Sequence, residues 1–167
     1  YPAVPQGGGS RRIRRGEPVM IDLVFGYNGY FVDKARTYFI GQPSAACREA
    51  YDLCLEIQEA IVSRLRPGTR CASIYEEVME TFAGASPFWD HFMGCGENRV
   101  RFLGHGVGLE LDEWPVLAPG FRAPLLAGMT VAVEPKFFPP GLGGIGVENT
   151  YRVTDASPEK LTDYPDE

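Results

Sequence analysis

The sequence predicts an α+β fold with an antiparallel sheet, because strand-like segments stand on both sides of two helical segments. The Asn-Gly pair at 28–29 divides the first apolar segment and is typical of a two-residue hairpin turn. Apolar residues at every third or fourth position over 44–66 indicate an amphipathic helix. The strand-like segments are 19–41 before the helices and 101–111, 129–138 and 145–153 after them.

The elements follow one another in a simple order. Residues 1–18 are rich in Pro, Gly and Arg and are expected to form an irregular leading segment before the hairpin. Ser44 can cap the first helix, and the Arg-Pro-Gly sequence at 66–68 ends it. A shorter helix is predicted over 72–83, followed by an irregular stretch over 84–101. We expect residues 1–167 to form a single domain with one core.

Composition excludes several classes of protein. The chain has 167 residues, of which 44% are hydrophobic and 23% charged, and it has no apolar run long enough to span a membrane. Its net charge of −6 argues against a nucleic-acid-binding protein. The four cysteines have no CxxC spacing, so we expect reduced thiols and a cytoplasmic location.

Two aspartates stand among the apolar residues of the predicted hairpin. Counting from the Asn-Gly turn places Val24 opposite Asp33 and Ala35 opposite Asp22, so the aspartates share a face as diagonal neighbours about 7–8 Å apart. Two carboxylates that converge on a buried face need a cation or a proton between them. The alternative is one surface aspartate and one aspartate paired with Arg36.

Three more residues extend this pattern. His105 lies between two glycines, which let the backbone come close to a site, while Glu134 and Glu148 each lie in an apolar, strand-like run. Each could be structural on its own. With Asp22 and Asp33 they provide one imidazole and four carboxylates, a ligand set that suits two divalent ions such as Mn, Fe, Co or Zn.

These segments resemble the pita-bread metallopeptidase family, which includes methionine aminopeptidases, prolidases, Xaa-Pro aminopeptidases and creatinases. The resemblance extends over about residues 15–155 and is closer to the proline-directed branch. It rests on Asp22 in an apolar strand, Asp33 in DKARTYFIG, His105 in GHGVGLE, Glu134 in VEP and Glu148 in GGIGVEN.

The resemblance implies a curved antiparallel sheet flanked by helices, with two divalent metal ions held by those five residues. It implies hydrolysis of N-terminal Xaa-Pro or similar small peptide bonds through a water that bridges the ions, with Glu134 taking part in proton transfer. The expected partner is a small peptide substrate, with no nucleic acid and no membrane, and a homodimer is compatible with the family.

Several residues depart from the family pattern. Asp112 and Gln6 stand where the family has histidines that contact substrate and stabilise the tetrahedral intermediate, so we treat Asp112 as a candidate catalytic residue and Gln6 as a substrate contact. Lys136 replaces a glycine, Gly146 replaces an arginine, and Asn149 follows the last glutamate. These departures leave two alternatives open, namely a same-fold enzyme acting on another small substrate and a non-catalytic binding module.

Two aromatic regions are candidates for the substrate pocket. His91 lies in an aromatic stretch, FWDHF, that leads toward the His105 segment, and Trp114 follows that segment. Both are treated as substrate-binding candidates, although a half-buried aromatic cluster would explain His91 equally well.

The family's domain begins with helices and strands that have no counterpart in this sequence. We therefore expect this chain to lack the N-terminal portion of the domain and to need it, or a partner chain, to complete the fold. Without that portion, a sheet edge and an apolar face should be bare.

Overall fold

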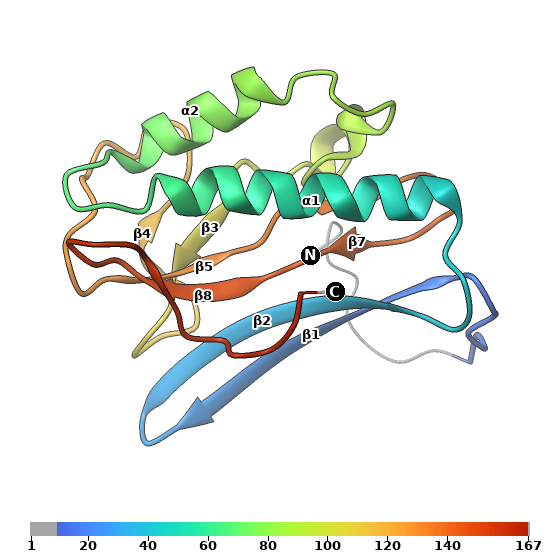
Figure 1. The fold of residues 1–167 in the computed structure, drawn as a ribbon, viewed down its shortest axis with the longest axis horizontal. Helices are drawn as coiled ribbons and strands as arrows, with labels where there is room; N and C mark the ends of the chain where they lie inside the picture. Colours follow the sequence, from blue (N-terminus) through green and yellow to red (C-terminus); the bar gives the residue numbers. More distant parts are fainter. Residues whose placement is uncertain (1–9, 167) are drawn as a thin grey trace.

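The computed structural model describes residues 10–166, which run from a long hairpin through two helices into a set of short strands (Figure 1). Strands β1 (Pro18–Tyr27) and β2 (Tyr30–Phe39) form the predicted hairpin. The two turn residues have φ angles of 51° and 83°, both positive as a type I′ turn requires. The observed register is the one counted from the turn, so Asp22 and Asp33 share a face.

The two helices also lie where the sequence predicts them. Helix α1 (Ala45–Ser63) begins at Ser44, whose hydroxyl accepts a hydrogen bond from the Cys47 N–H at 3.2 Å. It ends three residues earlier than predicted because the proline of the Arg-Pro-Gly sequence disfavours helical backbone before it. Helix α2 (Cys71–Thr81) follows. The predicted apolar stripe of α1 is buried at Ala50, Cys54, Ile57 and Ile61.

The remainder of the described chain consists of short elements. Two 3₁₀ helices, η1 (Trp89–His91) and η2 (Gly96–Asn98), lie in the stretch predicted to be irregular. Strands β4, β3, β5, β8 and β9 form an antiparallel sheet in that order, and β6 pairs with β7. The strands are β3 (Gly104–Gly106), β4 (Glu113–Val116), β5 (Thr130–Val133), β6 (Lys136–Phe137), β7 (Ile145–Gly146), β8 (Asn149–Arg152) and β9 (Glu159–Lys160).

These strands are shorter than the sequence predicts. Of the strand predicted over 101–111 only Gly104–Gly106 is regular strand. The segment predicted over 129–138 breaks at Glu134 and Pro135, because proline has no N–H to donate to the ladder. The segment predicted over 145–153 is divided into β7 and β8. Strands β4 and β9 were not predicted.

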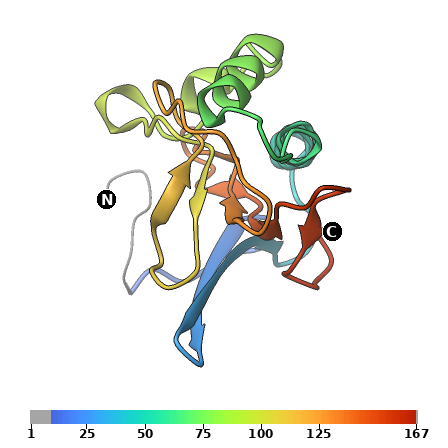
Figure 2. The ribbon, with the colours of Figure 1, turned by 90° about the vertical axis from the view of Figure 1, so that its left-hand side faces the viewer.

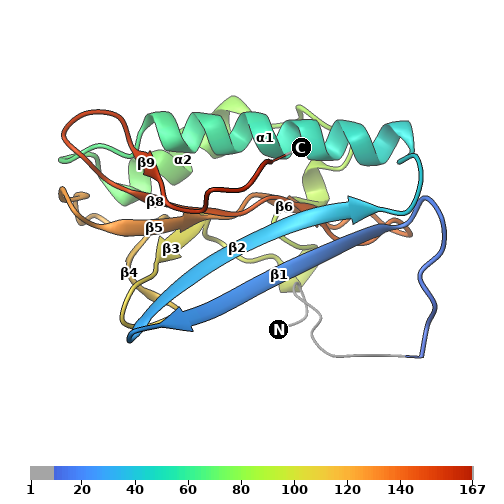
Figure 3. The same cartoon turned by 60° about the horizontal axis from the view of Figure 1, so that its bottom comes forward.

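The helices and the hairpin lie on opposite sides of the central strands (Figure 2). The core fills the space between α1, α2 and the strands, and its members include Ile57, Ile61, Val131, Val133 and Val147. Strand β2 runs beside β8 (Figure 3), where the Glu148 N–H donates to the Ala35 carbonyl at 3.0 Å and the Thr150 hydroxyl donates to the Asp33 carbonyl at 2.8 Å. These bonds fix β2 against the segment that leads into β8.

Strand β1 is an exposed edge of the described structure. Its large apolar side chains face solvent, and Phe25 and Tyr27 are 63% and 71% exposed. The expectation of a bare sheet edge and a bare apolar face is therefore confirmed for the described residues. No described helix combines the length and the hydropathy needed to cross a membrane.

Candidate metal centre

Three of the predicted metal ligands meet at one point of the fold. Asp33 comes from β2, His105 from β3 and Glu148 from the residue that precedes β8. One ligand atom of each residue lies within 4.8 Å of the other two, and all three side chains are buried. Segments far apart in the sequence thus converge, as a shared metal site requires.

The position of His105 depends on the glycines that flank it. A Cβ at Gly104 would lie 2.3 Å from the Ala132 carbonyl oxygen, and one at Gly106 would lie 2.4 Å from the Trp114 carbonyl oxygen, so only glycine lets β3 pass between its neighbours. His105 Nδ1 lies 3.0 Å from the Gly106 carbonyl oxygen. Because a carbonyl only accepts, Nδ1 carries the proton and Nε2 presents its lone pair, as a metal-binding histidine does.

The buried carboxylates repel one another. Burial first, and then the charge of Asp22, raises the pKa of Asp33 from 3.8 to about 7. Burial, followed by the charges of Glu134 and Asp33, raises the pKa of Glu148 well above its ordinary value. Asp33 Oδ1 is also buried without a hydrogen-bond partner among the described residues. A cation would relieve both the repulsion and the unpaired oxygen.

Asp22 approaches the cluster from the edge strand. The charge of Asp22 contributes to the raised pKa of Asp33, so the two carboxyl groups converge as predicted. The expectation that this face is buried is wrong for Asp22, which is exposed because β1 is an edge.

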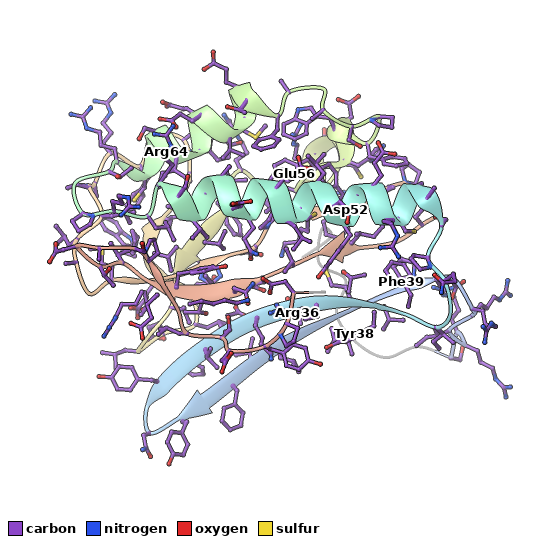
Figure 4. The ribbon with its side chains drawn as sticks, in the orientation of Figure 1. Arg36, Tyr38, Phe39, Asp52, Glu56 and Arg64 are labelled. Atoms are coloured by element: carbon purple, nitrogen blue, oxygen red, sulfur yellow. The ribbon has the colours of Figure 1, made fainter. Side chains whose placement is uncertain are left out.

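The alternative pairing of Asp33 with Arg36 is not formed. Arg36 extends toward the C-terminal segment (Figure 4), pairs with Asp166 at 2.8 Å and donates to the Glu148 carbonyl at 2.6 Å.

Glu134 also lies at the cluster, where it is paired with Lys136, a residue that was not among the predicted site residues. Its Oε1 lies 3.4 Å from His105 Nε2, while its Oε2 forms an ion pair with the ammonium of Lys136. Glu134 and Lys136 are both buried, at 5% and 4% exposure. The sequence signal for this pair is a lysine inside an apolar strand, two residues after a predicted ligand.

Asp112 lies beside His105. Its Oδ1 is 3.4 Å from His105 Nδ1, and its side chain is 73% exposed. The carboxylate is thus on the side of the imidazole ring away from Nε2, where its charge favours a proton on Nδ1.

The other candidate residues are more scattered. His91 lies in η1, and its carbonyl accepts a hydrogen bond from the N–H of Phe138, the residue that follows β6. The Nδ1 atom of His91 is buried without a hydrogen-bond partner among the described residues. Trp114 lies in β4 next to β3 and is 75% exposed. Gln6 lies outside the described residues.

Oxygen and nitrogen donors in this arrangement suit a divalent ion. Asp33, His105 and Glu148 provide two carboxylates and one imidazole, the mixture typical of Zn, Mn, Co and Fe sites. The Asp33 oxygen that has no hydrogen-bond partner in the described part of the chain and the orientation of His105 agree with that use. The residues present therefore fit a divalent metal ion.

Comparison with known proteins places this arrangement in context. A profile of metallopeptidase family M24 matches residues 2–155. The chain is 36% identical to an Xaa-Pro dipeptidase of Pyrococcus furiosus over 164 residues, which are 96% of this chain and 44% of that protein. The crystal structure of the prolidase from Pyrococcus horikoshii OT3 matches with a TM-score of 0.86 at 32% identity, covering 99% of this chain and 46% of that one.

A more distant solved structure also matches. The methionine aminopeptidase of Thermotoga maritima matches with a TM-score of 0.72 at 26% identity, covering 90% of this chain and 66% of that one. The chain spans less than half the length of the two proline-directed relatives. These matches confirm the resemblance and the pita-bread α+β fold that it implies.

Proposed function

Since this chain belongs to metallopeptidase family M24, we propose that it contributes the metal centre of a hydrolase that cleaves N-terminal Xaa-Pro or similar small peptide bonds. The two proline-directed relatives are an Xaa-Pro dipeptidase and a prolidase, which supports this substrate class. The observation that carries the proposal is the meeting of Asp33, His105 and Glu148 within 4.8 Å in a buried position.

The proposed centre holds two divalent ions, chosen from Mn, Co, Zn and Fe. Asp33, His105 and Glu148 would hold one ion, and Asp22 and Glu134 would complete the set for the second. Such ions supply Lewis acidity toward a peptide carbonyl and lower the pKa of water.

The chain's own residues have distinct tasks around this centre. His105 keeps Nε2 directed at the cluster because the Gly106 carbonyl accepts from Nδ1. Asp112 reinforces that orientation from 3.4 Å, a role that differs from proton donation by a histidine. Glu134 accepts the proton that water loses as it attacks the peptide carbonyl, through the oxygen that faces His105.

Three further residues are proposed to contact the substrate. The exposed indole of Trp114 stands on the strand next to His105 and provides an apolar face for a proline ring. His91 offers its buried Nδ1, which has no hydrogen-bond partner among the described residues, as a hydrogen-bonding group. Gln6 is proposed to donate a hydrogen bond to the oxyanion.

The exposed face of β1 is proposed to contact a further portion of the polypeptide or a second copy of the chain. Its apolar side chains, with Phe25 at 63% exposure, would then be removed from water. The four free cysteines support a reducing compartment, so we propose that the protein is cytoplasmic.

The test is an assay of the purified protein, loaded with Mn²⁺, on Leu-Pro and Leu-Ala dipeptides. We expect hydrolysis of Leu-Pro in preference to Leu-Ala, loss of activity on chelation, and recovery when Mn²⁺ is returned. Glu148→Gln should remove both activity and bound metal. Glu56→Gln makes the same chemical change on the exposed face of α1 (Figure 4) and should alter neither.

Each failure has its own meaning. Metal binding without hydrolysis of any dipeptide would support the binding-module alternative and overturn the proposed activity. Hydrolysis that survives complete chelation would overturn the proposed metal dependence.

A further inference from the structure

Arg36 lies on β2 three residues after Asp33, so its side chain is on the opposite face of the strand from the carboxylate cluster. It is 4% exposed, and each of the three guanidinium nitrogens donates at least one hydrogen bond. Nη1 donates to the carbonyls of Ala35 and Glu148, at 2.8 and 2.6 Å. Arg36 thus contacts the backbone beside one predicted metal ligand and the backbone of another.

The junction between β2 and β8 depends on a few individual contacts. In the part of the chain that the structure describes, the two strands belong to separate sheets, so their register is not set by a regular ladder. The Glu148 N–H donates to the Ala35 carbonyl at 3.0 Å, and the Thr150 hydroxyl donates to the Asp33 carbonyl at 2.8 Å. The bond from Arg36 to the Glu148 carbonyl holds the peptide group on the other side of Glu148.

The remaining donors of the guanidinium face residues 162–166, toward which Arg36 extends (Figure 4). Nε donates to the Pro165 carbonyl at 2.9 Å, and Nη2 donates to the Tyr164 carbonyl at 3.1 Å. Nη2 also lies 2.8 Å from Asp166 Oδ1, in an ion pair. This carboxylate keeps the guanidinium in the interior, because a buried charge without a counter-ion is costly.

Asn149 extends the network to helix α1. It directly follows Glu148 and is completely buried. Its Oδ1 accepts from Arg36 Nη2 at 2.7 Å, and its Nδ2 donates to Gln58 of α1 and to Asp166, both at 2.9 Å. Strands β2 and β8, helix α1 and the segment that contains Asp166 therefore meet around one guanidinium.

We propose that Arg36 and Asp166 are positioning residues of the metal centre, which hold the Asp33 and Glu148 carboxylates at a fixed separation from the opposite face of β2. This proposal rests on the proposed metal-dependent function. Without Asp166 the guanidinium loses its counter-ion, so it should move toward water and release the Glu148 carbonyl. Because no regular ladder joins β2 to β8, the two carboxylates can then shift relative to each other. Loss of such outer contacts typically weakens metal binding about 10- to 100-fold.

The test measures Co²⁺ binding to the wild-type chain and to Asp166→Ala. Each protein is stripped with chelator and titrated with Co²⁺, whose visible absorption reports both the amount bound and the coordination geometry. Asp163→Ala is the matched control, because Asp163 is an exposed residue of the same segment. Arg36→Lys is a second variant, which keeps the positive charge and loses the planar guanidinium fork.

A further control separates positioning from a general loss of stability. Val78→Ala removes buried side-chain volume from α2, which lies on the opposite side of the central strands from the hairpin (Figure 2). It should lower the melting temperature of the metal-free protein without changing the metal centre. All titrations are made well below the melting temperature of each protein, so that only folded chains are compared.

In Asp166→Ala and Arg36→Lys we expect Co²⁺ to bind at least about tenfold more weakly than in the wild type, with an altered visible spectrum. Asp163→Ala and Val78→Ala should match the wild type in both affinity and spectrum. If one of the two positioning variants does not fold, the other decides the question.

Wild-type affinity and an unchanged spectrum in a folded positioning variant would overturn the inference and leave the proposed function intact. An equal loss of affinity in Val78→Ala would also overturn it, because metal binding would then follow stability alone. Absence of bound Co²⁺ from the wild type at every concentration would refute the metal centre itself and with it the proposed function.

Discussion

Replacement of Asp33 by Asn should have opposite effects on stability and on metal binding. The amide that replaces the carboxylate cannot carry a negative charge, so the repulsion from Asp22 and Glu134 disappears. The metal-free protein should therefore become more stable at neutral and alkaline pH. The same substitution removes a carboxylate ligand, so metal should no longer stabilise the protein.

The magnitude follows from the pKa of Asp33, which lies at about 7 in the folded chain and 3.8 for the isolated group. That difference corresponds to about 4 kcal/mol at 1.36 kcal/mol per pKa unit. We expect Asp33→Asn to gain half of this value in stability, about 2 kcal/mol, because Asp22 is exposed and keeps part of the cluster in contact with water.

The pH dependence has a definite sign. Between pH 4 and pH 7 the folded chain keeps a proton on Asp33 that the unfolded chain releases, so the stability of the metal-free wild type falls as pH rises through this range. Above pH 7 the loss is complete. Asp33→Asn lacks this loss, so its advantage of about 2 kcal/mol at pH 8 should shrink toward zero near pH 4.

Urea unfolding of the metal-free proteins at pH 4.5 and pH 8 measures these differences, and the melting temperature with added Mn²⁺ measures the metal effect. Asp52→Asn on the exposed face of α1 is the matched control (Figure 4) and should change neither. A loss of stability of about 1 kcal/mol or more in metal-free Asp33→Asn at pH 8 would show that the carboxylates of the cluster do not repel one another. This threshold is about half the size of the expected gain.

Three further substitutions test the surroundings of the centre. Gly146→Ala places a Cβ 2.6 Å from the Lys136 Cβ and should destabilise the chain by about 2 kcal/mol in urea unfolding; a change near zero would show that the β6–β7 approach is not tight. Arg36→Met breaks the pair between the buried Arg36 and the half-buried Asp166 and should cost about 3 kcal/mol in the same assay, whereas a neutral result would mean that the pair is dispensable. Trp114→Ala should leave stability almost unchanged and raise KM for Leu-Pro about fivefold with little effect on kcat; an unchanged KM would remove the indole from the proposed substrate site.

The hairpin was the most predictable part of this fold. Its register depends on local chemistry, because the Asn-Gly turn determines which residues lie opposite one another. Asp22 and Asp33 could therefore be placed on one face from the amino-acid sequence alone. Helix α1 was predictable for a similar reason, since its cap at Ser44 and its apolar stripe are both local signals.

The short strands and the long-range contacts were less predictable. Strands of two to four residues carry little periodicity, so β4, β6, β7 and β9 have no distinct pattern in the sequence. The exposure of Asp22 could not be read from its apolar neighbours, because it depends on β1 being an edge strand. The ion pair of Lys136 with Glu134 arises where the chain leaves the ladder at a proline and continues as a new strand.

The most direct test of the metal centre is X-ray diffraction at the zinc absorption edge from crystals of the protein grown with Zn²⁺. We expect an anomalous peak at a bonding distance, about 2.0–2.2 Å, from His105 Nε2, with an oxygen of Asp33 and an oxygen of Glu148 in the same coordination sphere. Zinc bound elsewhere in the crystal, with no peak between these three side chains, would contradict it.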